Sequence, residues 1–300
     1  MNKVCITTSS FDIDANPHLL GLAARGFEMH LNPHRKQLNE AQAIDFMRAH
    51  NPVAVIAGVE PWTAAVMDAA PALKVISRVG VGVDMVDFAA ARDRGIAVRS
   101  TPDAPAPAVA ELTLGLILAM LRKVATLDRR LRAGEWAKAQ GPLLAGKTVA
   151  VVGYGRIGRR VAELLRAFEA IPVPYDPVTA PGDLGALLEQ ADIVTLHLPY
   201  SVETRHIIDA AMIARMKNGA YLVNASRGGL VDEDALCAAL RDGKLAGAAF
   251  DVFEQEPYAG PLCGFDAVVL TPHVGSAAIE VRRRMETEAA ANLVEALGLS

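Results

Sequence analysis

The sequence is poor in several features that mark specialised classes of protein. Its 300 residues include 3 cysteines, aromatic side chains make up 5% of the chain, and the formal net charge at pH 7 is −4. Cys5, Cys237 and Cys263 are odd in number and far apart, which argues against a disulfide framework or a metal site and predicts a reducing, cytoplasmic location. The small net charge gives no reason to expect nucleic acid or a membrane surface as a partner.

Long apolar runs are missing as well. The longest, LTLGLILAML at 112–121, is too short to span a bilayer and is flanked by Glu111 and Arg122. We expect it to form a buried helix between domains. Hydrophobic residues still make up 52% of the chain and charged residues 21%, which predicts a globular protein with a large core. A chain of this length suggests about two domains.

What the sequence does contain is a regular alternation of strand and helix patterns. Between residues 98 and 274, apolar runs such as KTVAVVG (147–153) alternate with helical patterns. Because the strand runs are continuously apolar, helices should cover both faces of a parallel sheet, as in a doubly wound α/β domain. A smaller α/β pattern precedes this region, and one helical pattern follows it. We therefore predict one domain over 98–274 and a second, discontinuous domain over 1–97 and 275–300.

The hexapeptide GYGRIG (153–158) fits the G-x-G-x-x-G pattern of a dinucleotide-binding loop. An apolar strand precedes it and an amphipathic helix follows, which is the context that the pattern needs. Gly153 would permit the tight turn, Gly155 the approach of a pyrophosphate, and Gly158 the close packing of helix on strand. The helix N-terminus would attract the phosphates. Asp176, after the next apolar run, could bind the ribose hydroxyls and would repel a 2′-phosphate, which favours NAD over NADP.

Polar residues follow several predicted strands, and ligands bind at the carboxyl ends of strands in open parallel sheets. A histidine after a strand, as in AVVLTPHVGS (267–276), is more often structural or exposed than catalytic when it stands alone. Arg227, in NASRGG, could hold a carboxylate through its planar guanidinium. Glu256 could orient His273 and favour its charged form. Asp251 could add to the negative charge that favours the protonated form of His273, or it could hold the nicotinamide amide.

These stretches resemble the D-isomer-specific 2-hydroxyacid dehydrogenase family in order and spacing. The resemblance implies two doubly wound parallel-sheet domains, a Rossmann NAD domain and a flavodoxin-like substrate domain, with a cleft between them. It also implies a homodimer formed through the NAD domain, because the helix at 112–121 and LDRRLRAGEW (127–136) resemble the dimer arm. The matching segments are GYGRIG with YDP, NASRGGLVDEDAL, GAAFDVFEQEP and LTPHVGS, and in the first half SRVGVGVDMVD and APAVAELTLGLILAM.

The resemblance further implies roles for individual residues. The catalytic triad of the family falls on Arg227, Glu256 and His273. Substrate contacts are implied for Arg227 and for the loop Val79, Gly80 and Val81, whose amides would hold a carboxylate. Besides the three glycines, cofactor contacts are implied for Arg156, Ile157, Asp176, Leu198, Pro199, Thr204, Ala225, Ser226, Arg227, Asp251 and His273.

The expected reaction is the NAD-dependent interconversion of a D-2-hydroxy acid and its 2-oxo acid, with His273 as the acid/base. Residues 58–87 are most similar to short phosphoglycerate-dehydrogenase-like members, so 3-phosphoglycerate is the preferred substrate, with Arg78 as the candidate for binding its phosphate. Hydroxypyruvate or glyoxylate is nearly as well supported. Formate dehydrogenases have Gln in place of Glu256, which argues against that activity, whereas a phosphite-oxidising relative keeps the triad. The family's NAD-binding corepressors offer the alternative of a binding protein without turnover.

Overall fold

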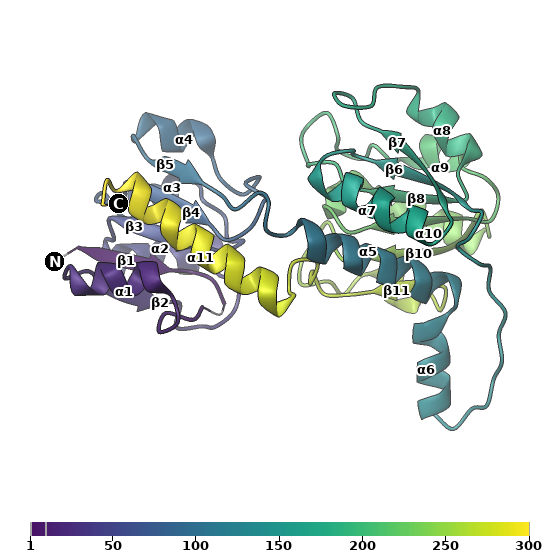
Figure 1. Ribbon diagram of the computed structural model, residues 1–300, viewed down its shortest axis with the longest axis horizontal. Coiled ribbons are helices and arrows are strands. Elements are labelled where there is room, and N and C mark those ends of the chain that lie inside the picture. The colour runs from purple at the N-terminus through teal and green to yellow at the C-terminus, as the bar shows by residue number, and fades with distance from the viewer. Residues whose placement is uncertain (1, 10, 300) are drawn as a thin grey trace. The chain divides into compact units, whose positions relative to one another are not determined.

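The computed structural model describes residues 2–9 and 11–299, and the chain divides into two units (Figure 1). The first comprises Met1–Pro105 and Ala278–Ser300, and the second comprises Ala106–Ala277. The boundaries predicted from the sequence, after residues 97 and 274, lie slightly earlier. A boundary after residue 97 would cut strand β5 (Ala97–Arg99), which pairs with β4 (Val75–Arg78) in the sheet of the first unit.

The first unit is built on a five-stranded parallel sheet in the order β2-β1-β3-β4-β5. This is the flavodoxin-like order, which confirms the expected fold. Consecutive residues of β3 belong to two cores on opposite faces: Val55 packs with residues of α2, α3 and α4, and Ile56 with residues of α1 and α11. The other elements are β1 (Lys3–Ile6), β2 (Glu28–Leu31), β3 (Ala54–Ala57), α1 (Pro17–Ala24), α2 (Glu40–His50), α3 (Ala64–Asp68), α4 (Phe88–Asp93) and α11 (Ile279–Ala296).

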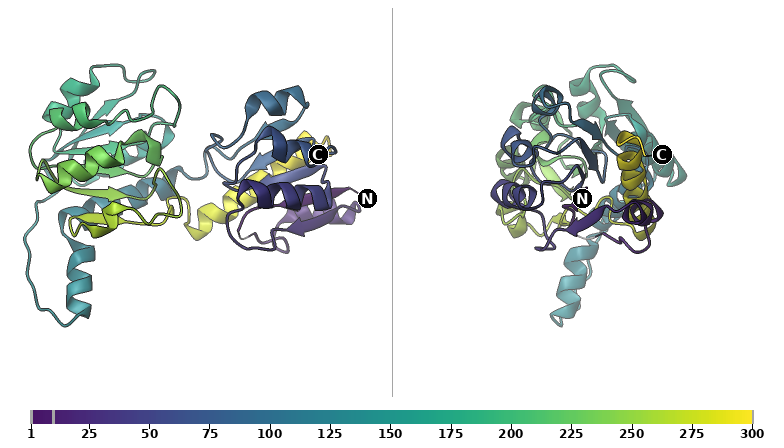
Figure 2. Two further views of the ribbon diagram at one scale, coloured as in Figure 1. Left: turned by 180° about the vertical axis from the view of Figure 1, so that it is seen from behind. Right: turned by 90° about the vertical axis from the view of Figure 1, so that its left-hand side faces the viewer.

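Helix α11 returns from the far end of the sequence to pack on this sheet (Figures 1 and 2). Its small residues Ala289 and Ala290 are fully buried and let the helix lie close to the strands. The Ser77 hydroxyl of β4 donates a hydrogen bond to the Ala289 carbonyl oxygen at 2.7 Å. The first unit is therefore completed by the last segment of the chain.

The second unit is built on a six-stranded parallel sheet in the order β11-β10-β9-β8-β6-β7. Alternate residues of β6 face two cores, with Val149 and Val151 toward α5 and α7 and Ala150 and Val152 toward the opposite face. The predicted buried helix at 112–121 is part of α5, which packs on α7 and β10 within this unit. The strands of this unit are β6 (Thr148–Val152), β7 (Ile171–Tyr175), β8 (Ile193–Leu196), β9 (Ala220–Asn224), β10 (Leu245–Phe250) and β11 (Val268–Leu270). Its helices are α5 (Ala106–Leu121), α6 (Val124–Arg132), α7 (Arg156–Ala167), α8 (Leu184–Gln190), α9 (Ala210–Arg215) and α10 (Glu233–Arg241).

Strand β7 forms an edge of the second sheet, which departs from the usual Rossmann order 3-2-1-4-5-6. In that order, β6 corresponds to strand 1 and β7 to strand 2. Among the described residues no strand lies beyond β7, where strand 3 would pair with it. The Ile171 amide donates to the Lys147 carbonyl oxygen, and the Tyr175 carbonyl oxygen accepts the Gly153 amide. Because alternate residues of a strand direct their backbone groups to the same side, those of Pro172 and Pro174 face away from β6. Because proline has no N–H group, these two residues remove donors from the open edge and discourage pairing with another strand.

Two further features concern the described residues as a whole. None of their helices is long and apolar enough to cross a membrane. Within the same residues, no group of three or more His, Cys, Asp or Glu side chains is placed to hold a metal ion.

Candidate active site

The glycine-rich loop lies between β6 and α7, where two of its glycines are needed because the backbone is crowded. A β-carbon at Gly153 would overlap the backbone of His197, and one at Gly158 would overlap the Gly153 carbonyl. Gly153 also has φ of 98°, a conformation that side chains disfavour. Space around Gly155, in contrast, is open, and no side chain caps the helix that begins at Arg156. The loop therefore presents open backbone next to the N-terminus of a helix, as a phosphate site requires.

Asp176, at the end of β7, connects its own turn to the glycine-rich loop. Its Oδ2 accepts the Tyr154 amide at 2.9 Å, and its Oδ1 accepts the amides of Val178 and Thr179, both at 2.9 Å. Partial burial would raise the pKa of this carboxyl, but the hydrogen bonds outweigh that effect and hold the pKa of Asp176 below its ordinary value. Asp176 is thus a fixed negative charge beside the loop.

The loops after β8 and β9 are joined by hydrogen bonds among predicted cofactor residues. The Ser226 hydroxyl donates to the Leu198 carbonyl oxygen at 2.6 Å. The Thr204 hydroxyl donates to the Pro199 carbonyl oxygen at 2.8 Å and accepts the Ser201 amide at 2.8 Å. Ala225, which directly follows β9, is buried. The segments at 198–204 and 225–227 therefore form one connected rim at the carboxyl ends of adjacent strands.

His273 and Glu256, which are distant in sequence, are in direct contact. His273 Nδ1 and Glu256 Oε2 lie 2.8 Å apart, and Glu256 Oε1 accepts the Phe253 amide at 3.1 Å. Burial would raise the pKa of Glu256, but the hydrogen bond and charge of His273, the Phe253 amide and the charge of Arg227 outweigh it and lower that pKa. Glu256 is therefore held as a carboxylate. Because Nδ1 is engaged, Nε2 is the ring nitrogen left to exchange a proton.

The turn that carries His273 is fixed by Asp251, which is only 1% exposed. Asp251 Oδ1 accepts the Thr271 hydroxyl at 2.6 Å and the Val274 amide at 2.9 Å, while Oδ2 accepts the Gly275 amide at 2.8 Å. The His273 amide donates to the Asp251 carbonyl oxygen at 2.8 Å. These bonds hold His273 at φ of 53°, in the left-handed region that a non-glycine residue rarely adopts.

Arg227 follows β9 on a loop that packs closely against the segment leading to Glu256. A β-carbon at Gly228 would overlap the backbone of Phe253, so this glycine is required for the approach. Arg227 Nη1 donates to the Ser226 carbonyl oxygen at 2.8 Å, and the side chain is half-buried. The structure thus brings the three predicted catalytic residues to one edge of the second sheet.

In the first unit, the loop after β4 departs from its predicted use. The Val79 amide donates to the Ala57 carbonyl oxygen at 3.0 Å, and the Gly80 amide donates to the Thr101 hydroxyl at 2.9 Å. Both amides are therefore occupied inside the unit, which corrects the prediction that all three amides of the loop bind a carboxylate. Val81 is 40% exposed, and its amide has no acceptor among the described residues. The Arg78 guanidinium donates to the Val79 carbonyl oxygen and lies against Gly80.

Comparisons with known proteins identify the family. The profile described as "D-isomer specific 2-hydroxyacid dehydrogenase, NAD binding domain" matches residues 114–275. The chain belongs to the D-isomer specific 2-hydroxyacid dehydrogenases. It is 47% identical over 253 residues to a glyoxylate reductase of Thermofilum pendens, covering 78% of this chain and 75% of that relative. It is 43% identical over 246 residues to a D-3-phosphoglycerate dehydrogenase of Methanocaldococcus jannaschii, covering 77% of this chain but 47% of that relative.

A solved structure of the same family agrees along nearly the whole chain. The D-lactate dehydrogenase from Aquifex aeolicus, complexed with NAD and lactic acid, superposes with a TM-score of 0.84 at 26% identity, covering 99% of this chain and 96% of that one. The relatives of this 2-hydroxyacid dehydrogenase thus include enzymes named for different acids, and the family fixes the reaction class rather than the substrate.

The NAD-binding domain of this dehydrogenase has the features that the cofactor needs. The crowded positions of Gly153 and Gly158 and the open backbone at Gly155 form a cradle for a pyrophosphate. Asp176, at the end of the second strand of this sheet, would supply an acceptor for ribose hydroxyls. The residues of this chain therefore fit NAD.

Two residues that hold the dehydrogenase site together were missed by the sequence analysis. Asn224, at the end of β9, is fully buried; its Oδ1 accepts the Ser226 amide at 3.1 Å and its Nδ2 donates to the Arg227 carbonyl oxygen at 2.8 Å. Thr271 donates to Asp251 and so braces the turn of His273. A polar residue at the end of an otherwise apolar strand was the available signal for Asn224, because such a group must find partners when buried.

Proposed function

We propose that this chain reduces a 2-oxo acid to its D-2-hydroxy acid with NADH, and catalyses the reverse reaction, using His273 as acid/base. The observation that carries the proposal is the 2.8 Å contact between His273 Nδ1 and Glu256 Oε2, on a turn that Asp251 fixes. A carboxylate that accepts a hydrogen bond from one ring nitrogen orients the imidazole and stabilises its charged form.

The residues then have distinct parts in the reduction. NADH, when bound, supplies a hydride to the carbonyl carbon of the substrate. His273 Nε2 donates a proton to the carbonyl oxygen, and Glu256 stabilises the imidazolium before that transfer. Arg227 binds the substrate carboxylate through its guanidinium and polarises the carbonyl. In the reverse direction, neutral His273 accepts the proton of the hydroxyl group.

For the substrate, we propose an unphosphorylated short 2-oxo acid such as glyoxylate or hydroxypyruvate. The name of the Thermofilum pendens relative, which the alignment covers over most of its length, supports this choice. Phosphohydroxypyruvate, the acid paired with the 3-phosphoglycerate preferred on sequence, is the second candidate. Arg78, at the end of β4, favours it as a possible phosphate ligand, although the guanidinium already bonds to the carbonyl of its own loop.

The test is consumption of NADH by the purified protein with glyoxylate, hydroxypyruvate, phosphohydroxypyruvate and pyruvate. We expect turnover of an unphosphorylated acid, and a marked preference for NADH over NADPH because Asp176 would repel a 2′-phosphate. A preference for phosphohydroxypyruvate would support the second candidate. NADH binding without turnover of any 2-oxo acid would contradict the enzymatic proposal and favour the corepressor-like alternative.

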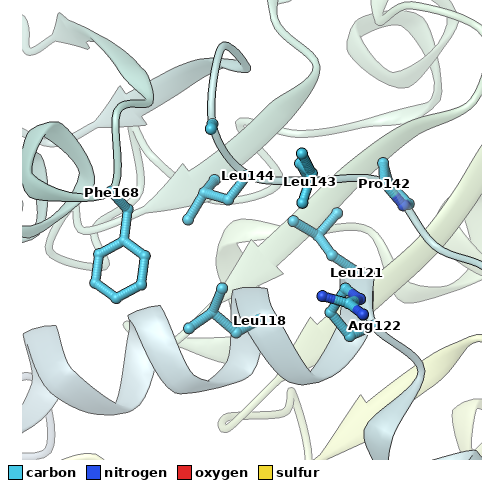
Figure 3. Close-up of a pocket in the computed structure, with 8 residues that line it drawn as sticks. Leu118, Leu121, Arg122, Pro142, Leu143, Leu144 and Phe168 are labelled. Atoms are coloured by element: carbon cyan, nitrogen blue, oxygen red, sulfur yellow. The ribbon is translucent and has the colours of Figure 1, made fainter.

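We also propose that the chain forms a homodimer through the second unit. Helix α6 has no buried residue and extends away from the sheet of its unit (Figures 1 and 2). Beyond it, Trp136 is 83% exposed. A cavity of about 180 Å³ lies at the end of α5, where apolar side chains converge (Figure 3). Its lining residues are Leu118, Leu121, Arg122, Pro142, Leu143, Leu144, Ala145 and Phe168.

Light scattering during size-exclusion chromatography tests the dimer. Isolated exposed apolar residues are ordinary, but Trp136 and every lining residue of the cavity except Phe168 lie between residues 118 and 145, on the stretch of chain around α6. Such a surface is the kind that a partner covers. We expect the mass of two chains for the wild-type protein and a shift toward one chain for Trp136→Ala. A wild-type protein with the mass of one chain at micromolar concentration would contradict the proposal.

We infer a cytoplasmic location from the cysteines. Among the described residues all three are unpaired, with Cys5 and Cys237 buried and Cys263 exposed. Burial raises the pKa of Cys5 to about 12, so its thiol stays protonated and unreactive. Detection in the cytosolic fraction of the source cell, and not in a secreted fraction, is the expected result.

A further inference from the structure

A second histidine–glutamate pair lies in the same unit as the contact between His273 and Glu256. His206 Nε2 and Glu254 Oε1 are in hydrogen-bonding contact, with side chains that are 30% and 42% exposed. Glu254 is two residues before Glu256, and His206 is two residues after Thr204. The two acids of this segment thus contact different histidines.

The backbone of His206 is fixed to the loop that carries Arg227. Its amide donates to the Gly229 carbonyl oxygen at 2.8 Å, and the Ile208 amide donates to the Leu230 carbonyl oxygen at 3.1 Å. His206 has φ of 50°, in the left-handed region. A side chain other than glycine keeps this conformation only where surrounding contacts impose it. The backbone at His206 is therefore held in one place beside the Arg227 loop.

The segment that carries Glu256 has no regular backbone support. Residues 251–260 belong to no helix or strand. Among the described residues, the backbone groups of 252–258 form no hydrogen bond with another backbone group. Because a segment without such bonds opens easily, the position of Glu256 depends on side-chain contacts.

Side chains take the place of the missing backbone bonds. The ring of Phe253 stacks on that of Tyr258, with their centroids 4.0 Å apart. The Glu254 amide donates to Glu233 Oε1, at the start of α10, at 3.0 Å. Since His206 binds the side chain of the same residue, Glu254 is held through both its backbone and its carboxylate.

We propose that His206 is a positioning residue, which holds Glu256 against His273 by way of Glu254. The inference rests on the proposed function, in which His273 is the acid/base. When the contact between His206 and Glu254 is broken, the segment gains freedom and Glu256 spends less time within 2.8 Å of His273. The imidazolium is then less well oriented and less stabilised, and proton transfer is slower.

The test measures kcat, with NADH and the best 2-oxo acid, for the wild-type protein and for His206→Asn. Asparagine is too short to reach Glu254, but it tolerates the left-handed backbone at this position. We expect kcat to fall about threefold, a smaller loss than for a substitution of Glu256 itself. KM for NADH and the midpoint of urea unfolding should change little, because a pair this exposed contributes little to stability.

Glu254→Ala breaks the same contact from the other side and should lower kcat by the same factor. This variant removes a negative charge near His273, whereas His206→Asn removes none, so equal losses indicate an effect of position rather than of charge. The matched control is Glu28→Ala. It removes a glutamate that is 43% exposed from a contact with His30 in the first unit, and it should leave kcat unchanged.

Combination with Glu256→Gln separates positioning from a general structural effect. If His206 acts through Glu256, His206→Asn should cause no further loss of kcat in Glu256→Gln. Should His206→Asn fail to fold, Glu254→Ala in the two backgrounds gives the same test.

Two results would refute the role of His206 and leave the proposed function intact. One is an unchanged kcat in His206→Asn and Glu254→Ala, and the other is an equal loss of kcat with and without Glu256→Gln. No turnover of any 2-oxo acid by the wild-type protein would refute the proposed function and this inference with it.

Discussion

The carboxyl edges of the two sheets each hold a carboxylate that is 1% exposed, but the two are used differently. In the second unit, both oxygens of Asp251 accept hydrogen bonds from the turn that carries His273. In the first unit, Thr7, Gly58 and Trp62 all donate to one oxygen of Glu60, which lies between the ends of two adjacent strands. A buried acid at a strand end can therefore hold one turn in place, as Asp251 does, or join the ends of two strands, as Glu60 does.

The largest expected effect is at the residue that Asp251 positions. His273→Ala should lower kcat for reduction of the best 2-oxo acid by about 10²- to 10⁴-fold, because the general acid is lost. Binding of NADH, followed by fluorescence titration, should change little in the same variant. A variant with near wild-type kcat would show that the turn carries no catalytic group.

Removing the carboxylate that holds the turn should affect both folding and catalysis. Asp251→Ala leaves the Thr271 hydroxyl and the amides of Val274 and Gly275 without their acceptor, which we expect to lower the free energy of unfolding by about 3 kcal/mol. Urea unfolding measures this change, and kcat should fall as His273 loses its fixed position. Asp242→Ala, at an exposed helix end, is the control and should change stability little. Equal stability of the two variants would contradict the structural role of Asp251.

The carboxylate that contacts His273 should have a smaller and pH-dependent effect. The pKa of Glu256 is lowered, so the side chain stays charged at neutral pH and supports the imidazolium. Glu256→Gln keeps a hydrogen-bond acceptor but removes the charge, and we expect kcat for reduction to fall about tenfold. Because the wild-type carboxylate loses its charge only below its ordinary pKa range, the difference in kcat between the wild-type protein and Glu256→Gln should shrink as the pH falls into that range. A difference that does not change with pH would mean that Glu256 only orients the ring.

A further effect concerns stability at acidic pH rather than catalysis. Burial lowers the pKa of His197 from 6.5 to about 3, and the ring Nδ1 has no partner among the described residues. Between these two pH values the histidine is protonated in the unfolded chain but not in the folded one. The free energy of unfolding therefore falls as the pH falls, by at most about 1.4 kcal/mol per pH unit. Denaturant unfolding from pH 6.5 to 4 should show a flatter dependence for His197→Gln than for wild type or for His34→Gln. Parallel curves would contradict the burial of a neutral ring.

Much of the fold and the site could be predicted from the sequence because local patterns specify them. Continuous apolar strands gave the parallel sheets, and the glycines at 153 and 158 are required by backbone contacts that any dinucleotide-binding loop shares. The absence of a described third strand beside β7 was not predicted, although Pro172 and Pro174 in IPVPY were a visible signal of an edge.

Long-range hydrogen bonds could not be predicted in the same way. Whether the Val79 and Gly80 amides are available depends on Ala57 and Thr101, which lie about twenty residues away in the chain, and no periodicity encodes those contacts. Likewise, Glu60 follows a strand like several other acidic residues, and only its three donors and its 1% exposure distinguish it. Charge positions can be found in a sequence, but the partners of each charge depend on tertiary structure.

The proposed reaction is hydride transfer to the carbonyl carbon of a 2-oxo acid to give the D-hydroxy acid. The most direct test supplies hydroxypyruvate with NADH in which both hydrogens of the transferring carbon are deuterium, and analyses the product by mass spectrometry and chiral chromatography. We expect D-glycerate with deuterium at the carbon that bears the new hydroxyl. Unlabelled glycerate, or the L-isomer, from a preparation that consumes NADH would contradict it.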